Sequence, residues 1–182
     1  PDESTPAGDT PSVPAAATRM LREYKPSPLT ATLQGLLANP DEFYVPSMDH
    51  ELLGQPAPDF ELGDWRGRRV RLDEALRQGP VVLIFYYGYW CDHCVVQLFD
   101  LNEEVDKFDE LGATLIAISA DPPETTADKF EQYGPFRFTV LSDPGNKVAE
   151  KYDCFDPASN GRESRQFHGS FVVDSAGVIR WA

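Results

Sequence analysis

The feature that most constrains this chain is the cysteine pair in Cys91-Asp92-His93-Cys94, which stands between two segments of different periodicity. Before it, residues 80–87 form a continuous apolar and aromatic run, which is typical of a strand buried on both faces. After it, apolar side chains recur at steps of four and three residues, which is typical of a helix with one apolar face. These are Cys94, Leu98, Leu101, Val105 and Phe108. The pair therefore falls where a buried strand is followed by an amphipathic helix.

This position predicts different roles for the two cysteines. Their spacing places both sulfurs within one helical turn, close enough to form a disulfide without moving the backbone. Cys91 falls at the first turn, where free backbone N–H groups and the helix dipole stabilise a thiolate, the nucleophile of disulfide exchange. Cys94 lies one turn further and begins the apolar face, as expected of a buried resolving thiol. A protonated His93 would stabilise the thiolate further, whereas Asp92 would oppose it.

Zinc and haem are the other known uses of such a pair. A structural zinc ion needs four ligands, and the chain offers only Cys154 and His168 for the second half. Covalent haem needs a histidine directly after the second cysteine, and Val95 stands there instead. A redox dithiol is therefore favoured over zinc, and haem is excluded. Cys154 is interpreted as a small buried residue, with an extra resolving thiol as the alternative.

The net charge of the chain limits the classes of molecule that it can bind. Its 182 residues include 16 Lys and Arg against 30 Asp and Glu, a net charge of −14. This balance argues against nucleic-acid binding and against docking on an anionic membrane surface. The longest apolar run, residues 81–87, is far shorter than the ~18 residues of a membrane span. The expected partners are protein or small-molecule thiols and disulfides, or hydroperoxides, together with an external thiol system.

The chain divides into three segments. Residues 1–18 contain four prolines and four alanines, and they are predicted to be a disordered leader. Residues 19–54 are predicted to be an N-terminal extension with a short helix over Leu29–Leu37. Residues 55–182 are predicted to form one domain, and its stop straight after a predicted strand suggests truncation at the C-terminus. No signal-peptide pattern is present, which leaves a cytoplasmic and a bacterial extracytoplasmic location both open.

Strands and helices alternate through residues 55–182. The further predicted strands are Ala113–Ser119, Phe138–Leu141, Gly169–Asp174 and Val178–Trp181, of which the last two pair as a hairpin. The further predicted helices are Glu124–Tyr133 and Lys147–Tyr152. This order predicts an α/β fold with a mixed central sheet flanked by helices.

From Gln55 to Trp181 the chain resembles the thioredoxin superfamily, and within it the redoxin/peroxiredoxin-like branch, the alkyl hydroperoxide reductase/thiol-specific antioxidant (AhpC/TSA) group. The matching stretches keep the family's order of elements. They are residues 54–60, 81–94, 118–121, 141–144, 148–152 and 171–174. The resemblance implies a thioredoxin-like fold and a thiol-dependent oxidoreductase. No organic cofactor is expected, because the two sulfurs hold both electrons.

One departure from the peroxiredoxins concerns the pair itself. Their pattern Pro-x-x-x-Thr-x-x-Cys falls here on Tyr87, Cys91 and Cys94, so that only the cysteine is kept. Instead, Trp90 and the pair resemble the Trp-Cys-x-x-Cys of thioredoxins and membrane-anchored thiol–disulfide redoxins. Those enzymes attack with the first cysteine and resolve with the second. His93, directly before the second cysteine, resembles bacterial disulfide-introducing oxidases and favours an oxidising poise.

A second departure concerns the strand that faces the dithiol. Thioredoxins place a cis-proline just before this strand and peroxiredoxins an arginine, whereas this chain has His168. One interpretation is a loop histidine without a role. The other is that His168 borders the cysteines as a proton donor, a metal ligand or a thiolate partner, and an imidazolium near Cys91 would stabilise its thiolate. Copper-delivering redoxins also combine a cysteine pair with a later histidine, although their pair is Cys-x-x-x-Cys.

The sequence thus predicts a thiol–disulfide oxidoreductase in which Cys91 attacks and Cys94 closes the internal disulfide. Trp90, His93 and His168 are the residues expected to tune the pair or to contact the substrate. The first alternative is a thiol peroxidase, in which one cysteine attacks a hydroperoxide and the other resolves the sulfenic acid. The second alternative is a copper-binding protein that uses Cys91, Cys94 and His168, since soft thiolates select Cu(I).

Overall fold

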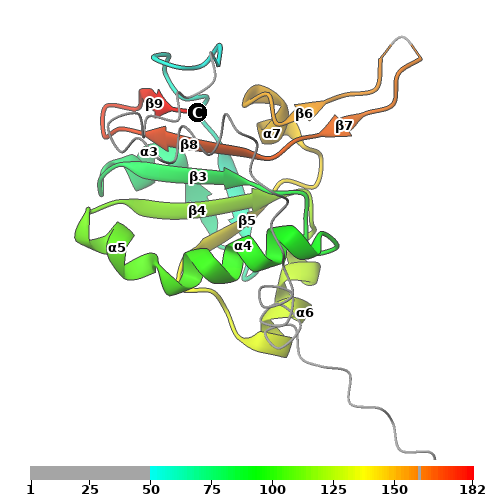
Figure 1. Ribbon diagram of the computed structural model, residues 1–182, viewed down its shortest axis with the longest axis horizontal. Coiled ribbons are helices and arrows are strands. Elements are labelled where there is room, and N and C mark those ends of the chain that lie inside the picture. Colours follow the sequence, from blue (N-terminus) through cyan, green and yellow to red (C-terminus); the bar gives the residue numbers. More distant parts are fainter. Residues whose placement is uncertain (1–49, 160) are drawn as a thin grey trace, which may run out of the picture.

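A seven-stranded sheet lies at the centre of the computed structural model, which describes residues 50–159 and 161–182 (Figure 1). The strand order is β2-β1-β5-β4-β3-β8-β9. These strands are β1 (Glu61–Asp64), β2 (Arg69–Arg71), β3 (Val81–Phe85), β4 (Thr114–Ser119), β5 (Thr139–Ser142), β8 (Gly169–Val173) and β9 (Ile179–Trp181). The helices are α3 (Leu72–Leu76), α4 (Asp92–Glu103), α5 (Val105–Glu110), α6 (Pro123–Tyr133) and α7 (Lys147–Lys151). A separate hairpin pairs β6 (Phe155–Asp156) with β7 (Arg165–Gln166). The predicted leader 1–18 and helix Leu29–Leu37 lie outside the described residues.

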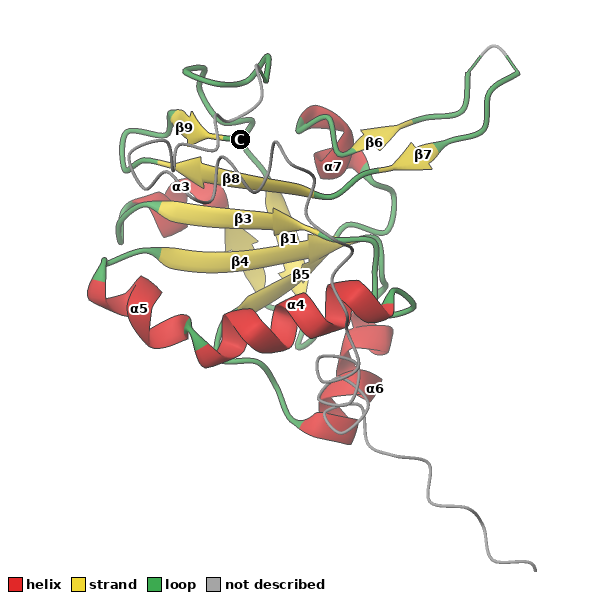
Figure 2. Ribbon diagram, viewed as in Figure 1, coloured by secondary structure: helices red, strands yellow, loops and turns green. Residues whose placement is uncertain are grey.

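The sheet is mixed, as predicted. β3, β4 and β5 are parallel, whereas β8 is antiparallel to β3 and β1 is antiparallel to β5 (Figure 2). Phe85 at the end of β3 pairs with Ile118 of β4 on one side and with Gly169 of β8 on the other. The loops that follow β3 and β4 and the segment that precedes β8 therefore meet at one end of the sheet.

Each face of the sheet carries its own apolar core, because side chains alternate along β3. Leu83 and Phe85 pack into the core on the α3 and α7 side. Ile84 packs into the core on the α4 and α6 side, together with Leu98 and Phe130. A mixed sheet with helices on both faces confirms the predicted fold class.

The prediction of one helix from Cys94 to Phe108 is wrong, because α4 and α5 are separate helices. Glu104 lies between them with φ −96° and ψ 1°, outside helical geometry. Glu103 and Glu104 place negative charge at the C-terminus of α4, where the helix dipole disfavours it. The apolar spacing continues through Val105, so periodicity alone could not locate the break.

Four short strands and one short helix were not predicted from the sequence. They are β1, β2, β6, β7 and α3. None of them exceeds five residues. Their sequences also lack an apolar run, since β2 is Arg-Val-Arg and β1 contains Gly63. Hydrophobic patterning cannot detect elements of this length and composition.

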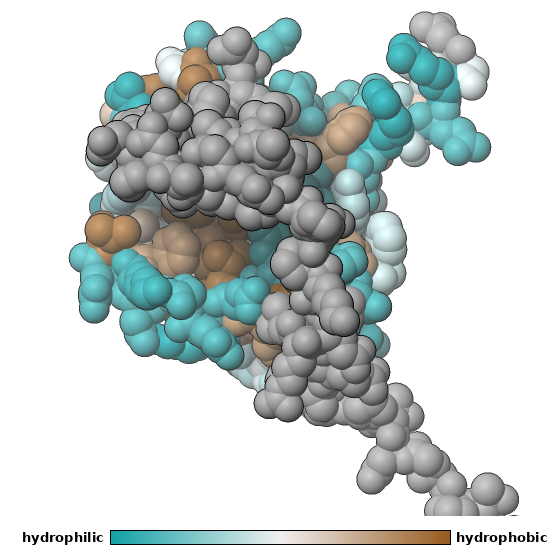
Figure 3. Space-filling view, in the orientation of Figure 1, coloured by the Kyte–Doolittle hydropathy of each residue, from teal (hydrophilic) through white to brown (hydrophobic). Residues whose placement is uncertain are grey.

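The outer faces of α4 and α5 are largely hydrophilic, and apolar surface lies beside them (Figure 3). A groove along these helices is lined by Leu101, Phe108 and Leu111, and Leu111 is 76% exposed. Within residues 50–159 and 161–182, the helices are too short or too polar to cross a membrane.

Candidate active site

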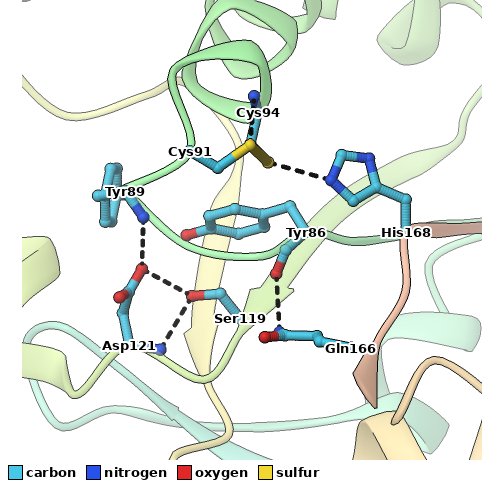
Figure 4. The surroundings of a disulfide bond; sticks show 8 residues. All are labelled: Tyr86, Tyr89, Cys91, Cys94, Ser119, Asp121, Gln166 and His168. Carbon is cyan, nitrogen blue, oxygen red and sulfur yellow. Dashed lines mark hydrogen bonds between the residues drawn. A yellow bond between two sulfur atoms is a disulfide. The ribbon is translucent and has the colours of Figure 1, made fainter.

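The cysteine pair lies at the N-terminus of α4, at the end of the sheet where the three segments meet (Figure 4). Cys91 is the N-cap residue, and its sulfur accepts a hydrogen bond from the backbone N–H of Cys94 at 3.4 Å. The two sulfurs are joined in a disulfide with a Cα–Cα distance of 5.3 Å, which confirms the predicted pairing. Cys91 is half-buried, whereas Cys94 is fully buried. A reactant can therefore reach Cys91 more easily than Cys94.

The loop between β3 and α4 is held by a carboxylate from the neighbouring strand. Asp121 follows β4, and its Oδ2 accepts a hydrogen bond from the backbone N–H of Tyr89 at 2.9 Å. The hydroxyl of Ser119 donates to the same oxygen at 3.1 Å and accepts from the backbone N–H of Asp121 at 3.2 Å (Figure 4). The amide of Cys91 in turn donates to the carbonyl of Gly88 at 3.2 Å. These bonds fix the backbone that leads into the first cysteine.

His168 lies beside the disulfide because β8 begins directly after it and pairs with β3. Its Nε2 is 3.1 Å from the sulfur of Cys94 (Figure 4). The neighbouring segment is attached to the loop, since the amide side chain of Gln166 donates to the carbonyl of Tyr86 at 3.4 Å. The histidine ring also packs edge-on against Tyr87, with ring centroids 4.1 Å apart.

The environment of His168 differs from the expected imidazolium beside Cys91. The sulfur at hydrogen-bond distance is that of Cys94, and partial burial of the ring lowers the pKa of His168 below its usual value. Burial penalises the charged imidazolium, so the neutral ring is favoured. A neutral ring offers one nitrogen as a hydrogen-bond acceptor.

Trp90 and His93 are both exposed beside the pair. The Trp90 side chain is 72% exposed and stacks on Tyr87, with nearly parallel rings 5.8 Å apart. His93 lies in the first turn of α4 and is exposed to solvent. The stacked aromatic pair thus forms an apolar surface next to the half-buried Cys91.

Three tyrosines bury their hydroxyl groups in the core on the α4 and α6 side, and this was not predicted from the sequence. The hydroxyls of Tyr86, Tyr89 and Tyr133 are buried, and within the described part of the chain none has a hydrogen-bond partner. Burial raises the pKa of all three, so they stay neutral. The sequence gives no signal that distinguishes a tyrosine with a buried hydroxyl from one that buries only its ring.

Asp121 was missed as well, although a signal for it existed. Its motif Ser119-Ala120-Asp121 begins at the last residue of a predicted buried strand. The ends of adjacent parallel strands meet at one edge of the sheet, so a carboxylate three residues past Ile118 falls near Gly88, three residues past Phe85.

Cys154 is a free thiol in the core on the α3 and α7 side of the sheet. Its side chain is buried, and its S–H donates to the carbonyl of Tyr152 at 3.5 Å. Burial raises the pKa of the Cys154 thiol to about 12. This agrees with the interpretation of Cys154 as a small buried residue.

We expect Cys154 in the oxidised native protein to resist alkylation by iodoacetamide at pH 8. With a pKa near 12, only about one thiol in ten thousand is ionised at that pH, and the thiolate is the reactive form. Mass spectrometry should show one alkylated cysteine after unfolding the oxidised protein, and three after reduction and unfolding. Peptide maps in which Cys154 is linked to Cys91 or Cys94 as the main species would contradict this assignment.

A dithiol at the first turn of a helix, on a mixed sheet with an antiparallel strand facing it, defines a redoxin of thioredoxin-like fold. The chain belongs to the AhpC/TSA family, whose model matches residues 53–182. It is 32% identical to the thiol-disulfide oxidoreductase ResA of Bacillus cereus over 72 residues, which cover 40% of each chain. It is 36% identical to a putative peroxiredoxin of Mycobacterium tuberculosis over 69 residues, which cover 38% of this chain and 45% of that protein.

Among solved structures, the chain is similar to the peroxidoxin BcpB of Mycobacterium tuberculosis. The TM-score is 0.62 at 29% sequence identity, over 70% of this chain and 81% of that one. The match to the curated relatives spans less than half of their length. The family and the fold are therefore shown, whereas the activity is inferred from the site itself.

Proposed function

We propose that this chain is a thiol–disulfide oxidoreductase in which Cys91 attacks and Cys94 resolves. The observation that carries the proposal is the difference between the two sulfurs at one helix N-terminus. Cys91 is half-buried and accepts the Cys94 N–H, which would stabilise its thiolate, whereas Cys94 is fully buried. The likeness to ResA supports the same chemistry.

The proposed reaction moves two electrons in two steps. The Cys91 thiolate attacks a substrate disulfide, forms a mixed disulfide and releases the first substrate thiol. The Cys94 thiol then loses its proton and attacks the Cys91 sulfur. The internal disulfide forms, and the second substrate thiol leaves. The substrate is thereby reduced and the dithiol oxidised, and the reduction potentials of the two couples decide which direction is favoured.

Trp90 and His168 have separate roles in this proposal. The exposed Trp90, stacked on Tyr87, provides an apolar surface for the group that carries the substrate disulfide. The neutral ring of His168 accepts a hydrogen bond from the Cys94 thiol and orients it toward Cys91. His93, exposed in the first turn of α4, would act on the Cys91 thiolate only through the charge of its protonated form.

Replacing His168 by alanine should slow the resolving step about tenfold and change the attack step less. The variant loses one hydrogen bond to the Cys94 sulfur, worth ~1–1.5 kcal/mol. Rapid mixing with a disulfide whose leaving thiol is coloured separates the two steps. His168→Gln retains a polar atom near the Nε2 position and should recover part of the loss. Equal slowing of both steps would indicate a structural effect instead.

A second candidate, peroxide reduction, is favoured by the likeness to the peroxidoxin and to the putative peroxiredoxin. Against it, Tyr87 and Cys91 stand where the peroxiredoxin pattern has proline and threonine, and His168 stands where it has arginine. Without those oriented groups, a thiolate lacks stabilisation of the transition state for O–O cleavage.

The deciding experiment compares two second-order rate constants of the reduced protein, one with a small disulfide and one with hydrogen peroxide. We expect the disulfide to react faster, and peroxide to react at the rate of an ordinary thiol of the same pKa. Fast and saturable peroxide reduction, with disulfides reacting slowly, would reverse the ranking.

A further inference from the structure

We propose that the reduced protein binds one Cu(I) ion through the sulfurs of Cys91 and Cys94 and the Nε2 of His168. The three donor atoms lie within 4.8 Å of one another, and Nε2 is already 3.1 Å from the Cys94 sulfur. They come from two segments that the sheet holds in place: the start of α4, and the residue before β8 (Figure 4). Only a small adjustment of the side chains is needed to direct all three at one ion.

The donor set fits Cu(I) better than zinc. Thiolates are soft ligands that select Cu(I), and the ion accepts two or three such donors. A structural zinc ion needs four ligands in tetrahedral geometry. In the part of the chain that the structure describes, the donor cluster at this site contains three residues. Cys154, which the sequence offered as a further zinc ligand, is buried, and its S–H donates a hydrogen bond to the carbonyl of Tyr152.

The site is open to entering metal on one side. His168 is exposed, Cys91 is half-buried and Cys94 is fully buried, so an ion can enter past the imidazole and the first sulfur. The carboxylate of Asp121 does not compete for the ion, because the Tyr89 amide and the Ser119 hydroxyl already bond to it.

Binding and disulfide exchange exclude each other. Both cysteines bind Cu(I) as thiolates, so any S–H proton still present is released to solvent. Two sulfur–copper bonds and one nitrogen–copper bond form, and no electron is transferred. In the disulfide form the same sulfurs are bonded to each other and cannot supply thiolates. Oxidation therefore removes the site, and a bound ion blocks the Cys91 attack.

The test titrates the fully reduced chain, without oxygen, with Cu(I) held by the coloured chelator bathocuproine disulfonate. We expect the protein to withdraw one equivalent of copper, and the disulfide form to withdraw none. Cys91→Ser and Cys94→Ser should each remove this binding, and His168→Ala should weaken it at least tenfold. The matched control is Cys154→Ala, which removes a buried thiol outside the donor cluster and should bind like the wild type.

X-ray absorption of the copper form should show two sulfur neighbours and one nitrogen neighbour. Unchanged affinity in His168→Ala, loss of affinity in Cys154→Ala, or tighter binding of Zn²⁺ than of Cu(I) would each overturn the assignment. Disulfide exchange is measured separately in the presence of a chelator. Failure of the copper site therefore leaves the exchange result standing, and the reverse also holds.

Discussion

Replacing Cys91 by serine is expected to abolish disulfide exchange, whereas replacing Cys94 by serine should stop the reaction halfway. Serine is not ionised near neutral pH, so loss of the nucleophile should reduce the rate on the order of a thousandfold or more. In Cys94→Ser the half-buried sulfur of Cys91 still attacks, and the mixed disulfide accumulates because Cys94 is no longer there to resolve it. Mass spectrometry would detect the substrate attached to Cys91 at one equivalent per chain.

The burial of the two sulfurs is the reason for this asymmetry. Cys94 is fully buried behind the first turn of α4 and touches His168, so a substrate disulfide cannot approach it in line. Cys154→Ala is the matched control, because it removes a thiol that takes no part in either step. A trapped adduct on Cys94 in the Cys91→Ser variant would instead show that the roles are reversed, as the alignment with the peroxiredoxin cysteine would have them.

The sequence predicted the elements that have strong patterns and missed those that depend on three-dimensional contacts. The run from Val81 and the apolar steps after Cys94 located β3 and α4, because burial on two faces and on one face leave different periods. The break at Glu104 changes no apolar position and so left no trace in the pattern. Local sequence was therefore sufficient to locate a buried strand and an amphipathic helix, and insufficient to locate a break between two helices.

In the active site, too, the residues placed by local spacing could be predicted from it, and those placed by strand pairing could not. The positions of Cys91 and Cys94 follow from local spacing, so the disulfide could be predicted from sequence. His168 is 74 residues from Cys94, and only the resemblance to a known family suggested where it lies. Its preference for the Cys94 sulfur could not be foreseen, because this depends on the register of β8 against β3. Asp121 reaches the loop through the parallel β3–β4 register in the same way.

Replacing Gly88 by alanine should lower both stability and activity more than any other change to the loop outside the cysteines. Gly88 is buried at φ +131°, a conformation that L side chains rarely adopt, and an added Cβ would lie 2.9 Å from both oxygens of Asp121. Backbone strain and overpacking together are expected to cost about 3 kcal/mol in the free energy of unfolding. Denaturant titration measures this loss.

The effect on exchange follows from the position of the loop. The carbonyl of Gly88 accepts a hydrogen bond from the backbone N–H of Cys91. The backbone N–H of the next residue, Tyr89, donates a hydrogen bond to the carboxylate of Asp121. A shift of about 1 Å in a reacting group can cost on the order of a hundredfold in rate, and we expect a loss of this size in the attack step. Gly67→Ala is the control, since Gly67 has φ +76° with open space around it and should cost only about 1–2 kcal/mol.

A double-mutant cycle separates the clash with Asp121 from the strain in the backbone. Asp121→Ala alone removes the acceptor of the Tyr89 amide and should destabilise the protein by about 1.5–3 kcal/mol. In the double variant the added Cβ of Gly88→Ala no longer meets a carboxylate, so the combined loss should be smaller than the sum by about 1–2 kcal/mol. Strict additivity would mean that the carboxylate moves aside freely. The Gly88 effect would then be backbone strain alone, and Asp121 would not hold the loop against the end of β4.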